Sequence, residues 1–182
     1  MESMTTVNIR SATQEDINAI TVINPSVEIS KTWQMDQGFE NGTMITKFRE
    51  ITLPRPIRLA YPFSEKSIRK NLEENDLNLV AEDKKHLFGL ISLIQSDGIP
   101  AARVTDLILD ENYRRKGICT SLLISAVDWL ITRNIKGIIL EMMLKNYPGV
   151  NMSKKLGFEF CGFNEIYYRN GQTAIYFHRK II

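Results

Sequence analysis

The sequence predicts a single α/β (α+β) domain with a mostly antiparallel sheet of about seven strands and helices flanking it. Short apolar runs bounded by turn residues account for the strands, and residues 120–133 repeat their apolar side chains with the period of one helical face. The 182 residues suit one compact domain, and 43% hydrophobic residues are enough for a core. Because no linker or internal repeat divides the chain, we expect one domain over residues 1–182.

The N-terminal third combines regular elements with a long interrupted segment. Residues 7–10 have the pattern of a strand, and Thr13 resembles the N-cap of a helix that reaches about residue 22. Prolines and glycines then interrupt residues 24–62. We expect an irregular or hairpin-containing insert on the substrate side, since long irregular segments in compact domains are often functional. A loop that only packs its aromatic residues on the core is the alternative.

The remaining elements follow in a regular order. Ser64 caps a helix that reaches about residue 73, and Gly157 can end a later helix. Residues 138–142 are apolar on both faces, which is typical of a buried central strand. A turn at residues 169–171 joins the last two strands. The other expected strands are 78–82, 87–94, 103–109, 159–168 and 173–179.

Composition excludes several classes of function. With 23 basic and 21 acidic residues, the net charge of +2 offers no global field for nucleic acid or anionic lipid. The two cysteines, Cys119 and Cys161, match no metal-ligand spacing and are too few for a disulfide framework. The most apolar run, 122–131, is too short to span a bilayer. We therefore expect a cytoplasmic protein without a metal, nucleic-acid or membrane partner.

A basic loop precedes the helix at 120–133. Arg114, Arg115 and Lys116 are followed by Gly117 and then by the helix. Unpaired N–H groups at a helix N-terminus, together with the helix dipole, bind phosphate oxygens, and glycine permits their close approach. The pattern indicates a site for a multiply anionic ligand, although a basic turn before a helix is more often solvated surface.

The segment from Asp106 to Leu123 resembles the coenzyme-binding motif of the GNAT superfamily of N-acetyltransferases, in which Arg/Gln-x-x-Gly-x-Gly/Ala follows the fourth strand. Asn146, Met152 and residues 156–158 fall in the order of that superfamily's second motif. Residues 33–62 of the insert, the strand around residues 140–141 and the ending at 174–177 more particularly resemble relatives of streptothricin acetyltransferase.

The resemblance implies a mixed, twisted sheet splayed between its fourth and fifth strands, with pantetheine in the gap. It implies an N-acetyltransferase that moves an acetyl group from acetyl-CoA (coenzyme A) to a primary amine of a small molecule, such as an antibiotic, or of a protein. Main-chain groups of Ile108 and Leu109 would pair with pantetheine, and the Leu109 N–H would stabilise the oxyanion. Asn146 would contact the coenzyme, and a homodimer is common among relatives. The pyrophosphate would lie on Arg114, Arg115, Lys116, Gly117, Ile118, Cys119 and Thr120.

Three positions depart from the family pattern. Cys119 stands where glycine or alanine is usual, and a helix N-terminus beside cations could make its thiol a nucleophile. Ser153 stands where many members carry a tyrosine that protonates the thiolate, and Tyr147 could replace it only if its turn folds inward. Thr105 falls where many relatives place a catalytic glutamate. A non-catalytic acyl-CoA-binding module is therefore the alternative function.

Acidic and aromatic residues supply the remaining candidates. An amine must lose a proton to attack, so Asp106 and Glu141 are equal candidates for the base, ahead of Glu111 in the loop. The alternative for Asp106 is a structural role, as a hydrogen-bonded acid on a strand that orients a loop. An aromatic and acidic pocket for a cationic amine would use Trp33, Asp36 and Tyr176, and core packing of the two aromatic residues is the alternative.

Overall fold

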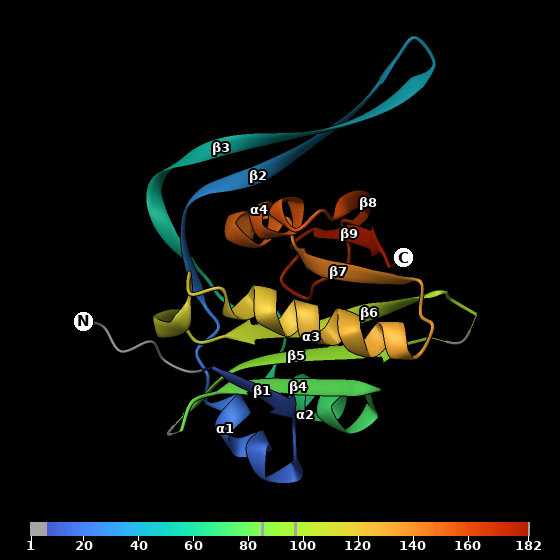
Figure 1. Cartoon of the computed structure of the whole chain (residues 1–182). Coiled ribbons are helices and arrows are strands. Elements are labelled where there is room, and N and C mark those ends of the chain that lie inside the picture. Colours follow the sequence, from blue (N-terminus) through green and yellow to red (C-terminus); the bar gives the residue numbers. More distant parts are fainter. Residues whose placement is uncertain (1–6, 85, 97, 182) are drawn as a thin grey trace. The chain divides into compact units, whose positions relative to one another are not determined.

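The computed structural model describes residues 7–84, 86–96 and 98–181. Its elements lie along the chain as Figure 1 shows them. In order they are β1 (Asn8–Ser11), the 3₁₀ turn η1 (Gln14–Asp16), α1 (Ile17–Thr21), β2 (Val27–Glu40), β3 (Thr43–Leu59), α2 (Glu65–Glu74), β4 (Leu77–Glu82), β5 (Leu87–Gln95), β6 (Ala101–Leu109), the 3₁₀ turn η2 (Glu111–Tyr113), α3 (Ile118–Thr132), β7 (Gly137–Met143), α4 (Tyr147–Lys155), β8 (Glu159–Asn164) and β9 (Ala174–Lys180).

Seven strands form one sheet in the order β1-β4-β5-β6-β7-β9-β8, and β2 and β3 form a separate two-stranded sheet. The pairs β1–β4, β4–β5 and β5–β6 are antiparallel, whereas β6 and β7 are parallel. This confirms the predicted mixed, mostly antiparallel seven-stranded sheet. The largest differences from the predicted boundaries are in the first helix, which is a 3₁₀ turn followed by the five residues of α1, and in β8, which ends at Asn164 instead of reaching residue 168.

The chain divides into two compact units. The first contains the described residues up to Pro25, the segment Phe63–Glu141 and the segment from His178. The second contains Ser26–Pro62 and Met142–Phe177, and so holds the β2–β3 hairpin, α4 and β8. A single domain over the whole chain therefore stays a prediction, and each unit is described by itself.

The core of the first unit lies on both faces of its central strands. Helix α3 covers one face of β4, β5 and β6, and α1 and α2 cover the other, as Figure 1 shows. Gly89 of β5 is packed so closely that a Cβ there would lie 3.3 Å from Leu122 of α3. Val80, Leu90 and Leu93 have no exposed surface. Because these strands are buried on both faces, they are apolar on both faces in the sequence.

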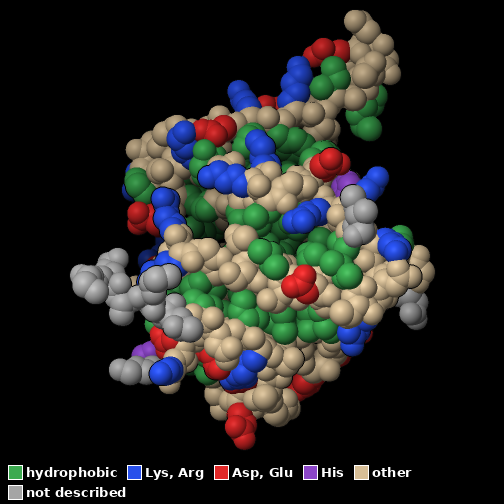
Figure 2. Space-filling model, viewed as in Figure 1, with side chains coloured by type: hydrophobic (Ala, Val, Ile, Leu, Met, Phe, Trp, Pro, Cys, Tyr) green, Lys and Arg blue, Asp and Glu red, His purple; other side chains and the backbone are tan. Residues whose placement is uncertain are grey.

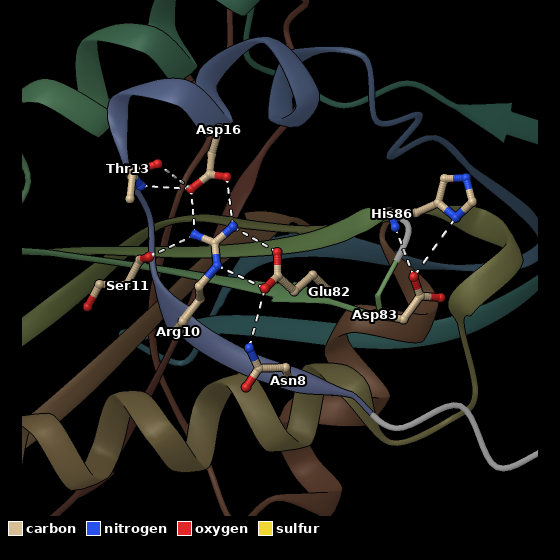
Figure 3. Close-up of polar contacts among 8 residues, drawn as sticks. All are labelled: Asn8, Arg10, Ser11, Thr13, Asp16, Glu82, Asp83 and His86. Carbon is tan, nitrogen blue, oxygen red and sulfur yellow. Dashed lines mark hydrogen bonds and ion pairs between the residues drawn. The ribbon is translucent and has the colours of Figure 1, made fainter.

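Arg10 links β1 to other elements of the first unit through hydrogen bonds and ion pairs, as Figure 3 shows. The Arg10 guanidinium donates to Asp16 at 2.6 Å and to Glu82 of β4 at 2.7 Å. Asp16 also accepts from the Thr13 main-chain N–H at 2.7 Å, so Thr13 does begin the helical turn. The hydrogen bonds from Arg10 hold the pKa of Asp16 at about 2, below its usual value, and lower that of Glu82.

The predicted insert is a long hairpin in the second unit. Strands β2 and β3 pair antiparallel from Val27–Leu59 to Glu40–Thr43, with one irregularity after Ile29. Asn41 and Gly42 form the turn with φ of 50° and 77°, which suits the right-handed twist of the strands. Residues 36–44 are all exposed, including Phe39 and Met44. Figure 2 shows hydrophobic side chains among charged ones at this end of the hairpin.

Candidate functional site

The basic loop begins where β6 ends, and an aromatic stack fixes its start. The Asp110 N–H donates to the Phe88 carbonyl at 2.9 Å, which holds the chain against β5. The Tyr113 ring then stacks on Phe88, with centroids 4.0 Å apart and an interplanar angle of 11°. The Asp110 side chain accepts from the Asn112 N–H at 2.9 Å and closes the 3₁₀ turn η2. The loop therefore starts from a rigid support.

The backbone of the loop alternates in handedness. Arg115 has φ of 59° and Gly117, the N-cap of α3, has φ of 78°. Consecutive N–H groups in such an arrangement face one concave surface that binds anions. The first helical hydrogen bond joins the Ser121 N–H to the Gly117 carbonyl at 3.0 Å. The N–H groups of Ile118, Cys119 and Thr120 precede it and so have no acceptor within the helix.

Gly117 is required by its dihedral angle. A Cβ added there would meet nothing within 4 Å, so space alone does not exclude a side chain. Its positive φ, however, is a conformation that residues with a Cβ adopt only at a cost. The open space beside it is the place that a ligand at the start of α3 would occupy.

The three cations of the loop differ in their surroundings. Arg115 and Lys116 are exposed, and the Lys116 ammonium lies 5.1 Å from the Tyr113 ring centroid. Arg114 is half-buried and its guanidinium donates to the Leu109 carbonyl at 3.3 Å. Arg114 therefore ties the loop to the end of β6, while Arg115 and Lys116 present charge to solvent. Together with the N–H groups, they suit the phosphates of a coenzyme.

Strand β6 leaves its neighbour before it reaches the loop. The ladder between β6 and β7 runs from Ala101–Gly137 to Val104–Leu140, and among the residues described it ends there. Ile108 and Leu109 lie beyond it and are in register with Leu90 and Gly89 of β5. This arrangement agrees with the expected splay between the fourth and fifth strands of the sheet.

A family model described as the acetyltransferase (GNAT) family matches residues 45–158, more than half of the chain. The chain belongs to this GNAT family. Like the family, it is an N-acetyltransferase that takes acetyl-CoA as co-substrate and transfers the acetyl group to an amine. The prediction of an enzyme is thereby confirmed.

Relatives and solved structures agree with the GNAT assignment. A streptothricin acetyltransferase from Escherichia coli is 28% identical over 148 residues, covering 79% of this chain and 77% of that protein. A [ribosomal protein bS18]-alanine N-acetyltransferase from Salmonella typhimurium is 28% identical over 115 residues, covering 62% and 75%. The resemblance to relatives of streptothricin acetyltransferase is confirmed.

Two solved structures share the fold over nearly the whole chain. A nourseothricin acetyltransferase superimposes with a TM-score of 0.82 at 19% identity, covering 97% of this chain and 99% of that one. A protein described as a putative streptothricin acetyltransferase from Bacillus anthracis, in complex with acetyl coenzyme A, gives 0.76 at 20% identity, covering 98% and 99%. At such identities the likeness shows the GNAT fold.

The surroundings of Cys119 do not favour the nucleophile alternative. Burial raises the pKa of its thiol to about 11, and the nearby Arg114 charge only partly opposes this. The thiol is therefore neutral near pH 7, and a neutral thiol is a poor nucleophile. Cys119 can serve the coenzyme through its main-chain N–H, which does not depend on the side chain.

Asp106 lies beneath α2. Its side chain is 1% exposed and accepts from the Asn71 amide at 2.7 Å. The neighbouring Thr105 hydroxyl accepts from Asn75 at 2.6 Å and donates to the Ser92 carbonyl at 3.2 Å. Asn71 and Asn75 are four residues apart and thus share one face of α2. Sequence reasoning missed both asparagines, although this spacing was a signal that could have found them.

Glu141 is also paired. Its side chain is only 4% exposed, and its carboxylate lies 3.3 Å from the Arg103 guanidinium across the β6–β7 ladder. Glu111 is exposed and accepts from the Asn24 amide at 3.4 Å. The sequence indicated that an acid at position 141 needs a partner or a function, and the structure supplies the partner. The base itself stays a prediction.

The second motif forms the start of α4 in the second unit. The Asn146 side-chain amide oxygen accepts from the Gly149 N–H at 3.1 Å and caps the helix. Ser153 is fully buried, and its hydroxyl donates to the Gly149 carbonyl at 3.0 Å. The Tyr147 hydroxyl donates to Glu50 of β3 at 2.9 Å. The contacts of Tyr147 are therefore made with the hairpin.

The substrate-side candidates do not share one face. Trp33 and Asp36 are three residues apart on β2, so they point to opposite faces of the hairpin. Trp33 stacks near Tyr147, with centroids 6.4 Å apart, and Asp36 accepts from Arg49 at 3.0 Å. Tyr176 packs edge-on against Tyr167 at 6.1 Å. A pocket made by Trp33, Asp36 and Tyr176 together therefore stays a prediction without support from these contacts.

The part of the chain that the structure describes lacks two other kinds of feature. It contains no helix long and apolar enough to cross a membrane. It also contains no group of three or more His, Cys, Asp or Glu side chains that could hold a metal ion.

Proposed function

We propose that this enzyme acetylates a primary amine of a small cationic molecule of the streptothricin class. The observation that carries the proposal is the streptothricin acetyltransferase relative, whose similarity extends over 79% of this chain. The ribosomal-protein acetyltransferase relative, similar over 62%, supports a protein amine as the second candidate. Tyr176 and Tyr167 supply aromatic rings that could contact a cationic acceptor.

The coenzyme contacts follow from the loop and from the end of β6. N–H groups from Arg115 to Thr120 hold the pyrophosphate, with the charges of Arg115 and Lys116 beside them. The positive φ angles of Arg115 and Gly117 support this role. Main-chain groups of Ile108 and Leu109, past the end of the β6–β7 ladder, pair with pantetheine, and the Leu109 N–H faces the oxyanion. Asn146 contributes its amide nitrogen, for which no hydrogen bond is found among the described residues.

Neither buried acid takes the proton from the amine directly. Asp106 is 1% exposed beneath α2, and the Glu141 side chain is 4% exposed beside Arg103, so neither carboxylate offers surface to a bound substrate. The amine instead loses its proton to water, and the two acids position the strands on which they lie. With no enzyme base, kcat/KM should rise with pH up to the pKa of the amine itself.

Titration calorimetry with acetyl-CoA, followed by thiol release in the same sample, tests the proposal. The acceptors are a streptothricin, a peptide beginning with alanine and a simple diamine at equal concentrations. Release that is fastest with the streptothricin supports the proposed acceptor. Release only with the peptide would favour the protein amine, and binding without release from any amine would contradict the acceptor class.

Two further properties belong to the proposal. A cytoplasmic location and a homodimer are expected from the sequence and its resemblance. Fractionation of cells that express the protein tests the location, and sedimentation equilibrium over a range of concentrations tests the dimer.

A further inference from the structure

The hairpin makes a close polar contact with the start of α4 inside the second unit. Trp33 of β2 lies directly opposite Glu50 of β3, and Lys31 is two residues before Trp33. Residues opposite each other, and residues two apart, point to the same face of a sheet. These three side chains therefore form one face of the hairpin.

That face receives Tyr147, the first residue of α4. The Glu50 carboxylate uses both oxygens, one accepting from Lys31 at 2.6 Å and the other from the Tyr147 hydroxyl at 2.9 Å. The Lys31 ammonium also lies 5.9 Å from the Tyr147 ring centroid. The hydrogen bond from Lys31 lowers the pKa of Glu50 most, and the one from Tyr147 lowers it further. The Glu50 carboxylate is therefore charged at neutral pH.

A second contact lies farther along the same helix. The Lys154 ammonium is 5.2 Å from the Trp33 ring centroid. Tyr147 and Lys154 are seven residues apart, which is two helical turns, so they share one side of α4. The hairpin therefore contacts α4 at its first turn and again near its end, and both contacts oppose rotation of the helix about its axis.

The residue held in place by this contact is Asn146. It precedes Tyr147 directly, and its side-chain oxygen is already used in capping α4. A Cβ on Gly149 would lie 2.7 Å from the Asn146 amide nitrogen, so this side chain is confined on that side as well. A small rotation of the first turn of α4 would move the amide nitrogen with it.

We infer that the β2–β3 hairpin positions the coenzyme-contacting Asn146 through the Glu50–Tyr147 contact, and so sets the affinity for acetyl-CoA. The inference rests on the proposed role of Asn146. It gives the hairpin a role in coenzyme binding. Glu50, Lys31 and Tyr147 are positioning residues, because they act through Asn146.

Tyr147→Phe and Glu50→Gln test the inference, since both keep the size of the side chain: the first removes the hydroxyl donor, and the second removes the charge and one of the two acceptor oxygens. The control is Glu40→Gln on the same hairpin, where the Glu40–Lys47 pair at 3.8 Å is exposed. Acetyl-CoA affinity is measured by calorimetry, and kcat and KM by thiol release. We expect both variants to weaken coenzyme binding about fivefold with kcat nearly unchanged, because preorganisation affects binding. Glu40→Gln should match the wild type.

One more variant separates the possible failures. Asn146→Ala tests the premise that the Asn146 amide contacts the coenzyme. A wild type that does not bind acetyl-CoA would overturn the proposed function itself. If Asn146→Ala binds weakly but Tyr147→Phe binds like the wild type, only the positioning role is overturned. A lower melting temperature with unchanged affinity in Tyr147→Phe would also overturn it.

Discussion

Replacing Gly117 by glutamate should abolish tight coenzyme binding while leaving the fold intact. A Cβ at this position meets nothing within 4 Å, so the cost to folding comes only from φ of +78°. A residue with a Cβ in that region costs about 1 kcal/mol, equivalent to about 2–4 °C in melting temperature for a chain of this size. The variant should therefore remain folded at 25 °C.

The effect on binding is much larger than the effect on folding. A carboxylate about 5 Å from one phosphate charge, at an effective dielectric constant of about 20, is repelled by about 3 kcal/mol. That energy corresponds to about a hundredfold loss of affinity, and a second phosphate adds to it. Gly117→Gln has the same size without the charge, so its smaller loss measures the steric part.

Calorimetry with acetyl-CoA on the folded variants provides the measurement. Gly42→Glu is the matched control, because Gly42 has φ of +77°, meets nothing within 4 Å of an added Cβ and lies at the hairpin turn. It should lose the same stability and keep its coenzyme affinity. Affinity in folded Gly117→Glu within about threefold of the wild type would refute the assignment of this loop to the phosphates.

Four further predictions follow from single contacts. Asp106→Asn and Glu141→Gln should each keep kcat within about threefold, whereas loss of a true base would lower kcat at least about a hundredfold at equal coenzyme affinity. Cys119→Ala should retain turnover, and Cys119 of the wild type should resist iodoacetamide at pH 7, because burial raises its thiol pKa to about 11; peptide mapping distinguishes it from the exposed Cys161. Gly149→Ala should weaken acetyl-CoA binding as much as Asn146→Ala, because its Cβ would displace the Asn146 amide; equal affinity to the wild type would contradict this. Asp16→Asn should lower the free energy of unfolding by about 2 kcal/mol above pH 4; because the folded-state pKa of Asp16 is depressed to about 2, the gap to the wild type should close as the pH falls from about 4 to 2 in thermal melts.

The fold and the coenzyme loop could be predicted because their signals are local. Ser64 accepts from the Ser67 N–H at 3.2 Å as a cap should, and Gly157 has the positive φ expected at a helix end. Gly117 lies between a strand and a helix, and its role as the helix N-cap can be predicted from the residues next to it. Such features are decided within a few residues and do not depend on the rest of the fold.

The partners of the acidic residues could not be predicted, because they lie far along the chain. Asp106 bonds to Asn71, 35 residues away, and Glu50 bonds to Tyr147, 97 residues away. A strand's alternation tells which side of the sheet an acid faces, but it does not tell which helix covers that side. The sequence therefore makes Asp106 and Glu141 equal candidates for the base. Only their burial beside Asn71 and Arg103 favours positioning roles for both.

Gly149 makes the start of α4 hard to predict from the sequence, and the structure explains why a glycine is there. A glycine after Pro148 weakens the prediction of a helix start, since glycine costs about 1 kcal/mol in a helix. The helix nevertheless begins at Tyr147, with proline in its first turn, where a missing N–H is harmless. Any larger residue at 149 would push the Asn146 amide out of place. A glycine at position 149 therefore weakens the helix locally but leaves room for the Asn146 side chain. A coenzyme contact through the Asn146 amide would require that room.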